Sequence, residues 1–411
     1  MSPAGRRALP AAAACFGLVL LLARLFHPGM LSRDSVEQLA QAVSGELDDW
    51  HPPLMAAVWG LLLRLPGFSK PQAAPLLFLL HLAAYGGAWA LAARALARRS
   101  TRGWVPWLAP LLALSPACLT YTVNVWKDVG LAVAWLLAAM LLLEVREARP
   151  RPLGRRMAAG ATLLLLLYGL GVRRNAVFGL PPLALLWWAT FVPARRGRLA
   201  GAVLLSVGLV GGSAALERFV LTPAPARQAQ LYLLSELTAM RCSGDGDPAV
   251  VFPDAVWKAG ADLDRLCRVT WGRIHRHHNA DHTVYGDEAP FVVAKEEHVT
   301  GDLLRALLDA IRRHPRTWAA HRIHMFGGLL DGRVVVLFHG VRENVLGLDF
   351  VPSAGTRLVS GYIAAFERTW LFAGWFWGLL AALGLWVTRR QVFGAAQAAF
   401  ASGLCYLAGY L

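Results

Sequence analysis

The sequence predicts an all-α polytopic membrane protein with about nine transmembrane helices. Hydrophobic residues make up 56% of the 411 residues and charged residues only 16%, whereas globular proteins carry about 25% charged residues. Apolar runs of near-bilayer length recur along the chain. Basic residues form short blocks between these runs and do not alternate with aromatic residues, so the net charge of +15 does not indicate a nucleic-acid partner.

The N-terminal stretch MSPAGRRALPAAAACFGLVLLLARLF has a basic start and an apolar core. Secretory signal peptides and first membrane spans share this composition. Because no clear small-x-small cleavage site follows the apolar core, we interpret the stretch as a retained first span.

Blocks of basic residues orient the candidate spans. They lie at residues 6–7, 94–102, 146–156, 195–198 and 389–390. When all five blocks are placed in the cytoplasm, the spans alternate consistently and the N-terminus is cytoplasmic. We therefore predict a multi-pass protein of the inner (plasma) membrane. The candidate spans are 9–26, 73–93, 104–122, 129–143, 157–172, 176–192, 199–216, 366–387 and 391–411.

This topology divides the chain into three parts. Residues 1–216 form an N-terminal transmembrane module with a first outer loop at 27–72. Residues 217–365 form one larger hydrophilic outer (periplasmic) segment, and residues 366–411 form the C-terminal transmembrane helices. The apolar stretch 53–65 is short for a span, and spanning would put the next basic block outside, so we predict an outer interfacial helix there.

Residues 34–47, in the first outer loop, have the spacing of an amphipathic helix. Asp34, Glu37, Gln38 and Gln41 fall on one face, and apolar side chains fall on the other. The pair Asp34 and Glu37 is also close to a capping box, in which Asp34 caps the helix and Glu37 reaches back. Capping and ligand contact are compatible, because a capping carboxylate keeps a second oxygen.

Cations lie at two predicted outer span ends, where the orientation rule does not expect them. NVWKDVG places Lys127 beside Asp128, and GVRRNAVFGLPP places Arg173 and Arg174 at another outer turn. These side chains either extend to the head groups of membrane lipids or line a cavity that binds an anion. The residues alone leave both interpretations open.

In their order along the chain, SRDS, DWHPPL, WKDV and RRNAVFGLPP resemble motifs of the GT-C class of membrane glycosyltransferases. The nearest likeness is to the protein mannosyltransferase and aminoarabinose transferase type, in an uncharacterised bacterial branch. It covers roughly residues 10–215, and the last two spans share only the general layout. The resemblance implies a GT-C fold and a cell-envelope enzyme that transfers a sugar from a polyprenyl-phosphate-linked donor on the outer face of the membrane.

The resemblance also implies roles for individual residues. Asp34 matches the acid of the first outer loop, which acts as a base or positions the acceptor, and Asp128 matches a second-loop acid; both are candidate catalytic residues. Lys127 and Arg174 stand where contacts to the donor phosphate are expected. The candidate substrate-binding residues are Glu37, His51, Lys127, Arg173 and Arg174.

The sequence assigns no definite cofactor, and the resemblance allows a divalent metal ion. Many relatives pair two acidic residues in the first motif, whereas Ser35 follows Asp34 here, which argues against metal binding by Asp34 alone. Independently of the resemblance, glycosyl transfer needs a carboxylate near the acceptor and cations near the departing phosphate.

Two other classes of function use the same residue types. A transporter or flippase of an anionic lipid-linked substrate would use the outer cations, but its typical inverted repeats are not found in the sequence. A non-catalytic membrane assembly protein would not depend on Asp34 or Asp128.

The predicted outer segment 217–365 contains nine of the 12 histidines and two of the five cysteines. In HRHHNADH, His278 and His282 have the helical spacing of a zinc pair. The arginines within and just before this stretch raise the local positive charge and favour a solvated basic patch instead. Cys242 and Cys267 share this segment, and we expect a disulfide between them in an oxidising periplasm.

Overall fold

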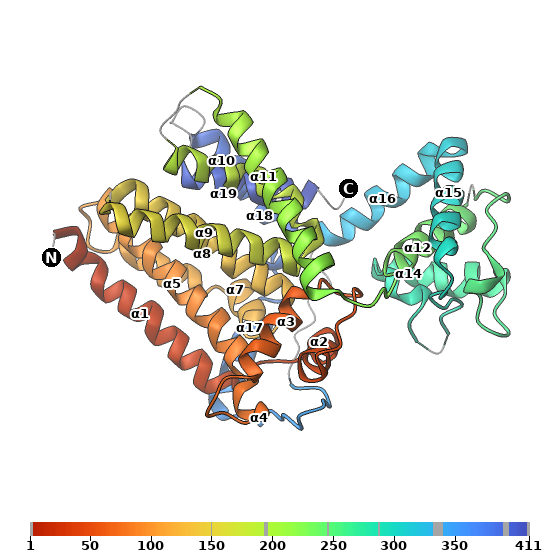
Figure 1. Ribbon diagram of the computed structural model, residues 1–411, viewed down its shortest axis with the longest axis horizontal. Helices are drawn as coiled ribbons and strands as arrows, with labels where there is room; N and C mark the ends of the chain where they lie inside the picture. The colour runs from red at the N-terminus through yellow and green to blue at the C-terminus, as the bar shows by residue number, and fades with distance from the viewer. Residues whose placement is uncertain are drawn as a thin grey trace. The chain divides into compact units, whose positions relative to one another are not determined.

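The computed structural model describes residues 3–148, 150–192, 196–244, 246–286, 288–331, 340–388 and 394–408. Their regular secondary structure is helical, and the β pairing among them is limited to isolated bridges (Figure 1). The chain divides into two compact units. Unit 1 consists of Met1–Ala224, Val336–Phe372 and Phe376–Tyr410, and unit 2 is built on Pro225–Val335.

Five helical segments of unit 1 are long and apolar enough to cross a membrane, and a bent pair of shorter helices is a sixth candidate. The protein is therefore a helical membrane protein, as the sequence predicts. The pair Val105–Ala113 and Pro116–Thr122 bends by 51°. The five segments are α1 (Pro3–Phe26), α4–α5 (Lys70–Ala73, Leu76–Arg99), α8 (Lys127–Ala148), α9 (Pro152–Val172) and α11–η3 (Arg198–Ala215, Leu216–Leu221).

The count of nine spans stays a prediction. The other three predicted spans coincide with helices of 12 to 15 residues, shorter than the length of about 20 that a bilayer requires. The basic residues Arg389 and Arg390, and Arg195, lie outside the described residues. The short helices are α10 (Leu180–Phe191), α18 (Gly374–Thr388) and α19 (Ala395–Ala408).

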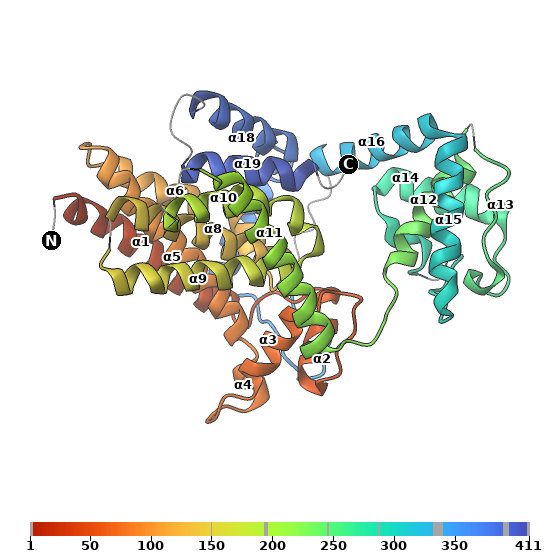
Figure 2. The ribbon, with the colours of Figure 1, turned by 45° about the horizontal axis from the view of Figure 1, so that its top comes forward.

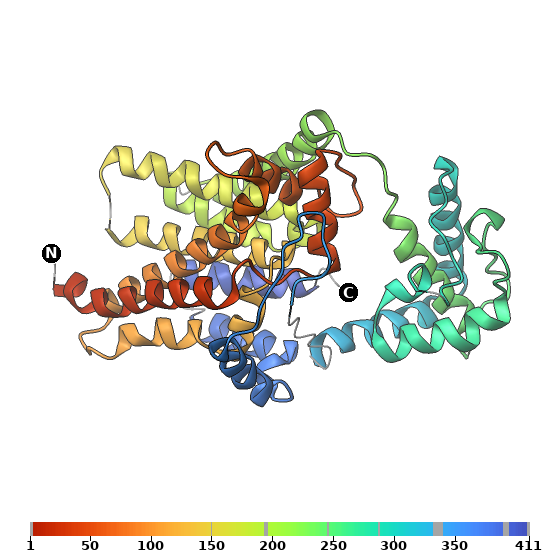
Figure 3. The same cartoon turned by 90° about the horizontal axis from the view of Figure 1, so that it is seen from below.

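Glycines allow the long helices of unit 1 to pack closely. A Cβ at Gly86 of α5 would collide with Val19 of α1, and one at Gly169 of α9 would collide with Trp135 of α8. Small residues at such crossings let helix backbones approach in a membrane. The helices α1, α5, α8 and α9 form a consecutively packed layer, which Figure 3 shows from below. Helix α19 packs on α10, where Ser402 Oγ donates to Gly179 O over 2.6 Å (Figure 2).

The loop at 27–72, predicted to lie outside the membrane, contains two helices that pack on each other, α2 (Arg33–Ser44) and α3 (Leu54–Leu63). Both predicted helices of this loop are present. The predicted capping box is wrong: Ser32 is the N-cap of α2, and its N–H donates to Ser35 Oγ over 3.2 Å. Asp34 and Glu37 therefore do not cap the helix.

The predicted polar face of α2 is also only half correct. Gln38 and Gln41 are buried, although the sequence pattern places them with the exposed acids. The buried stripe of α2 contains Ser35, Leu39 and Ala42 together with these two amides. Because α2 packs along α3, its buried side is decided by that neighbour and not by the apolar residues alone.

Three distant segments of unit 1 meet just before α2. Met30 N–H donates to Val123 O over 3.0 Å, and Val125 N–H donates back to Met30 O over 3.0 Å. On the other side, Arg342 N–H donates to Leu31 O over 3.2 Å. Parallel bridges thus join the residues before α2 to those before α8 and to the segment after residue 340.

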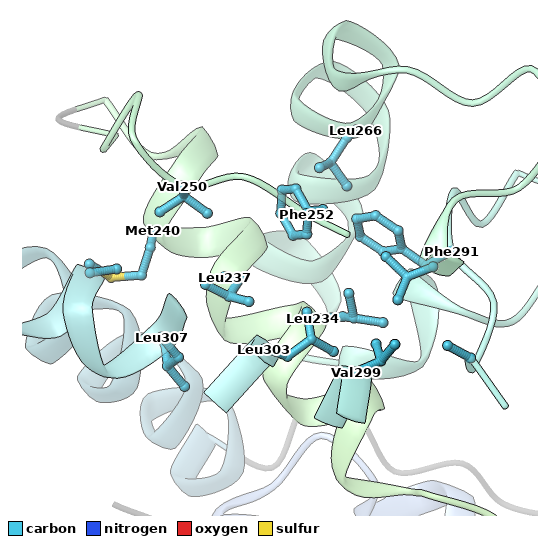
Figure 4. Packing of buried hydrophobic residues seen from close by; sticks show 13 residues of the cluster. Leu234, Leu237, Met240, Val250, Phe252, Leu266, Phe291, Val299, Leu303 and Leu307 are labelled. Atoms are coloured by element: carbon cyan, nitrogen blue, oxygen red, sulfur yellow. The ribbon is translucent and has the colours of Figure 1, made fainter. Parts of the chain in front are cut away.

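Unit 2 has its own apolar core, drawn in Figure 4. Leu234 and Leu237 of α12 pack with Phe252, Phe291 and Leu303. The predicted disulfide is present: it joins Cys242, at the end of α12, to Cys267, with a Cα–Cα distance of 4.9 Å. The helices of unit 2 are α12 (Ala229–Cys242), η4 (Asp254–Val256), α13 (Leu263–Arg265), η5 (Leu266–Trp271), α14 (Gly272–His277), η6 (Ala280–Thr283), α15 (Glu297–Arg313) and α16 (Pro315–Asp331).

The hydrophilic segment expected at 217–365 does not form one body. Unit 2 takes its central part, whereas η3 and the residues from 340 onward, including α17 (Ala354–Phe366), belong to unit 1. The residues from 340 onward belong there because their backbone pairs with the residues before α2.

Candidate functional site

The start of α2 is tied to the residues just before α8. Trp126 Nε1–H donates to Ser32 Oγ over 2.9 Å, and Ser35 Oγ–H donates to Val125 O over 2.8 Å. These hydrogen bonds hold the start of α2 against the start of α8. Asp34 lies between the two serines, in the first turn of α2, and its carboxylate faces Lys127, the first residue of α8.

A buried lysine connects Asp34 to a buried histidine. Lys127 Nζ–H donates to Asp34 Oδ2 over 2.9 Å, and Lys127 Nζ lies 2.7 Å from His51 Nδ1. Lys127 and His51 are 6% and 4% exposed. A lysine ammonium has donors only, so His51 Nδ1 must accept, and the ring proton of neutral His51 lies on Nε2.

His51 Nε2 faces two carboxylates without reaching either. It lies 3.7 Å from Asp34 Oδ2 and 3.6 Å from Glu37 Oε2, and it is buried with no hydrogen-bond partner among the described residues. Glu37 is also paired with Arg33, whose Nε lies 2.9 Å from Glu37 Oε1. The first turns of α2 therefore present two acids to one imidazole.

The surrounding charges keep both acids ionised. Burial alone would raise the pKa of Asp34, but the positive charge of Lys127, its hydrogen bond to the carboxylate and the positive charge of Arg173 outweigh it, so the pKa lies below its ordinary value. The pKa of Glu37 is lowered by His51 first and also by Arg33, against the opposing effect of burial. Asp34 and Glu37 are therefore carboxylates at neutral pH.

A second ion pair lies beside this group. Arg173, which follows α9, places its Nε 3.0 Å from Asp128 Oδ1 in the first turn of α8. A carboxylate in the first turn of a helix interacts favourably with the helix dipole. The predicted residues Asp34, Lys127, Asp128 and Arg173 are thus brought together by α2, α8 and the end of α9.

These side chains line a cavity of about 340 Å³. Four of its lining residues are basic and two are acidic, so the wall carries an excess of positive charge suited to an anion. Arg33 and Arg342 also line a neighbouring cavity of about 480 Å³, together with Glu37. The first cavity is lined by Ser32, Arg33, Asp34, Trp126, Lys127, Asp128, Arg173 and Arg342.

Arg33 and Arg342 are functional candidates that the sequence did not indicate. Arg33 precedes Asp34 in the SRDS motif, but the sequence pattern indicated a role only for the acid. Arg342 lies in the predicted outer segment, and no local pattern connects it to the first loop. No carboxylate lies within ion-pair distance of its guanidinium in the part of the chain that the structure describes.

Other predicted residues lie elsewhere. Arg174 does not line the cavity: its Nη2 donates to Glu217 Oε1 over 3.0 Å and to Asp49 O over 3.3 Å. His278 and His282 are not a zinc pair, because His278 stacks on His324 with ring centroids 4.5 Å apart and His282 lies against a different imidazole. Within the described ranges, no group of three or more metal-binding side chains occurs.

The cavity does not fit a divalent metal ion. Each of its carboxylates already contacts a cation, Asp34 with Lys127 and Asp128 with Arg173. A hard divalent cation would have to displace both, since it takes several oxygen ligands. No chemical step is therefore assigned to a metal.

Compared with known families, curated proteins and solved structures, the chain shows no match to any of them. The assignment of a function therefore depends on the chemistry of the cavity and on the resemblance of its motifs.

Proposed function

We propose that the chain is an integral membrane glycosyltransferase of GT-C type that uses a polyprenyl-phosphate-linked sugar at this cavity. The acceptor is a hydroxyl of a lipid, glycan or protein. The observation that carries the proposal is the buried Lys127, which holds the carboxylate of Asp34 at the wall of a cavity with surplus positive charge. That arrangement provides an acid for an acceptor and cations for a phosphate within one space.

The basic residues bind the phosphate of the donor. Arg342 offers its guanidinium without a competing carboxylate in the described residues, and a guanidinium can hold phosphate oxygens in a bidentate manner. Lys127, at the start of α8, and Arg173, which follows α9, add positive charge to the same cavity. Negative charge grows on the phosphate as its bond to the sugar breaks, and preformed cations stabilise this charge.

Asp34 faces the acceptor. The acceptor oxygen forms a bond to the anomeric carbon of the sugar, the bond from that carbon to the phosphate oxygen breaks, and polyprenyl phosphate leaves with the electron pair. The acceptor proton passes to Asp34. Because its lowered pKa makes Asp34 a weak base, its main contribution is the negative charge that steadies the oxocarbenium-like centre.

His51 keeps Lys127 in place. Its Nδ1 accepts one lysine N–H while Asp34 accepts another, so the ammonium is fixed and one N–H remains for the donor phosphate. His51 thus acts as a positioning residue, and its replacement would weaken the orientation of Lys127 without removing a charge from the cavity.

The test compares Asp34→Asn with Glu46→Gln, which removes the charge of an exposed acid in the same loop. The purified variants are incubated with a panel of polyprenyl-phosphate hexoses and pentoses, and released polyprenyl phosphate is measured by mass spectrometry. We expect release by wild type and Glu46→Gln and a large loss in Asp34→Asn. Equal release by Asp34→Asn would contradict the proposal, and transport of the intact donor without release would favour the flippase.

The proposal places the cavity on the outer face of the membrane. Ser69 and Ser100 lie at opposite ends of the α4–α5 segment, and the orientation rule puts Ser100 inside. In a background without free cysteines, an impermeant thiol reagent should label Ser69→Cys from outside and not Ser100→Cys. The reverse pattern would place the cavity in the cytoplasm.

A further inference from the structure

Unit 2 contains a second cavity, separate from the site of unit 1. It measures about 390 Å³ and is lined by Trp271, His275, His321 and Arg316, among others. A neighbouring cavity of about 540 Å³ shares Trp271 and His275 and adds two further arginines. The indole of Trp271 is thus common to both, and we call the two together the Trp271 cleft.

Buried polar atoms in this cleft lack partners in the described structure. His321 is 6% exposed, and neither of its ring nitrogens forms a hydrogen bond; the nearest acid, Glu236, has its Oε1 3.8 Å from Nε2. Ser243 Oγ, which belongs to the same cleft, is also buried without a partner. Unpaired polar groups are costly in a protein interior, so three of them around one cavity indicate a ligand-binding role.

Their chemistry suits a phosphate group. Burial lowers the pKa of His321 to about 4, so its neutral ring offers one N–H donor, and the Ser243 hydroxyl offers another. Arg316 lines the cleft, and within the described ranges no carboxylate lies within ion-pair distance of it. The described lining residues include no acid. A phosphate would therefore meet donors and positive charge without a repelling group among them.

The backbone holds the two sides of the cleft together. The disulfide joins Cys242, directly before Ser243, to Cys267, four residues before Trp271. Trp271 ends a π-helical turn, Leu266–Trp271, a conformation that occurs frequently at functional sites. The geometry of the cleft is thus fixed before a ligand arrives, which lowers the entropy cost of binding.

We propose that the Trp271 cleft is a binding site for a phosphate-bearing ligand whose phosphate is held by Arg316, His321 and Ser243. The flat face of Trp271 provides an apolar platform for the group that carries the phosphate. This group is either a soluble phosphate ester or the head group of an anionic lipid, and the two sources share the same phosphate contacts. The inference does not depend on the function proposed for unit 1.

The test is local to the cleft, because the full chain would bind phosphate at more than one place. Diethyl pyrocarbonate modifies unprotonated imidazoles, and peptide mass spectrometry reports the modification rates of His275 and His324 separately from those of other histidines. His298 is exposed in the same unit, with 72% of its side chain accessible, and it does not line the cleft, so it serves as an internal control. The full chain in nanodiscs is used throughout.

With glucose 1-phosphate at about ten times its dissociation constant, roughly one cleft in eleven is free, so the rates at His275 and His324 should fall about tenfold. In Arg316→Gln, loss of a charged hydrogen bond weakens binding by roughly tenfold or more, so the same concentration should slow modification by only about twofold. Arg305→Gln, an equal charge change at an exposed arginine outside the cleft, should behave as wild type. His298 should not respond in any variant.

A second arm identifies the source of the phosphate. Nanodiscs of phosphatidylglycerol are compared with nanodiscs of phosphatidylcholine, without added sugar phosphate. Protection by glucose 1-phosphate alone assigns a soluble ester, and protection by phosphatidylglycerol alone assigns a lipid head group. Absence of protection in both arms, or equal protection in Arg316→Gln and wild type, would overturn the proposal.

Discussion

The contact between Asp34 and Lys127 can be measured by a double-mutant cycle. Their charged atoms lie 2.9 Å apart, and at an effective dielectric constant of about 20 two unit charges at ~3–4 Å interact by roughly 4–6 kcal/mol. The Asp34 side chain is 52% exposed, whereas that of Lys127 is 8% exposed. Screening at Asp34 reduces the interaction toward that of surface pairs, so we expect a coupling free energy of about 1–2 kcal/mol.

The cycle uses Asp34→Asn, Lys127→Met and the double variant. The free energy of unfolding in mixed micelles is followed by far-UV circular dichroism during a titration with sodium dodecyl sulfate. Lys127→Met alone should lower this free energy by about 2–4 kcal/mol, because it removes the Asp34 contact and leaves buried His51 Nδ1 without a donor. Asp34→Asn should cost less, because the amide oxygen still accepts from Lys127.

A matched cycle between Asp34→Asn and Arg174→Gln serves as the control, since Arg174 pairs with Glu217 and does not line the cavity. Its two effects should add within about 0.3–0.5 kcal/mol. A coupling between Asp34 and Lys127 that is no larger than this control value would refute the geometry from which the site is built.

Three further predictions concern other features of the chain. Arg342→Gln should weaken binding of undecaprenyl phosphate by roughly tenfold or more, whereas Arg174→Gln should leave it unchanged; equal effects in a binding titration would remove Arg342 from the donor site. Because the folded-state pKa of Asp34 is lowered, its ionisation stabilises the fold above the unfolded pKa of about 3.9, and this contribution is lost as the pH falls through the folded pKa. The stability difference between wild type and Asp34→Asn should therefore be constant near neutral pH and shrink below about pH 4, and an unchanged difference at pH 3 would contradict this assignment. Cys242→Ser should destabilise unit 2 by about 3–4 kcal/mol, the loop-entropy value for the 25-residue separation from Cys267, as measured by unfolding with and without reductant; equal stability in both conditions for wild type would argue against the disulfide.

Local sequence patterns predict the helices of unit 1 well. The helices predicted for the first span and for the loop at 27–72 are present at Pro3–Phe26, Arg33–Ser44 and Leu54–Leu63, because apolar length and helical period are properties of neighbouring residues. The disulfide partners follow from composition, since Cys242 and Cys267 are the two cysteines outside the apolar runs. These features need no knowledge of distant contacts.

Features set by tertiary packing could not be predicted. The pattern D-x-x-E suggested a cap at Asp34, but hydrogen bonds from Trp126 and to Val125 select Ser32 and Ser35 at the helix start. From the sequence, Arg174 and its neighbour Arg173 were expected to act together. In the structure a short helix, Arg174–Phe178, begins at the second arginine. Arg173 pairs with Asp128, whereas Arg174 pairs with Glu217. Arg342 enters the cavity through backbone pairing with Leu31, which no local pattern encodes.

That pairing has a consequence for the order in which the protein is made. Met30 and Gly340 are in contact across 310 residues of sequence, so the wall of the cavity containing Arg342 is synthesised long after Asp34. At a translation rate of about 5–20 residues per second, the interval is roughly 15–60 s. Within this time Asp34, Lys127 and Arg173 are synthesised in turn, while the cavity still lacks Arg342. The binding site therefore stays incomplete during synthesis. It can be completed only after the segment that follows residue 340 has left the ribosome.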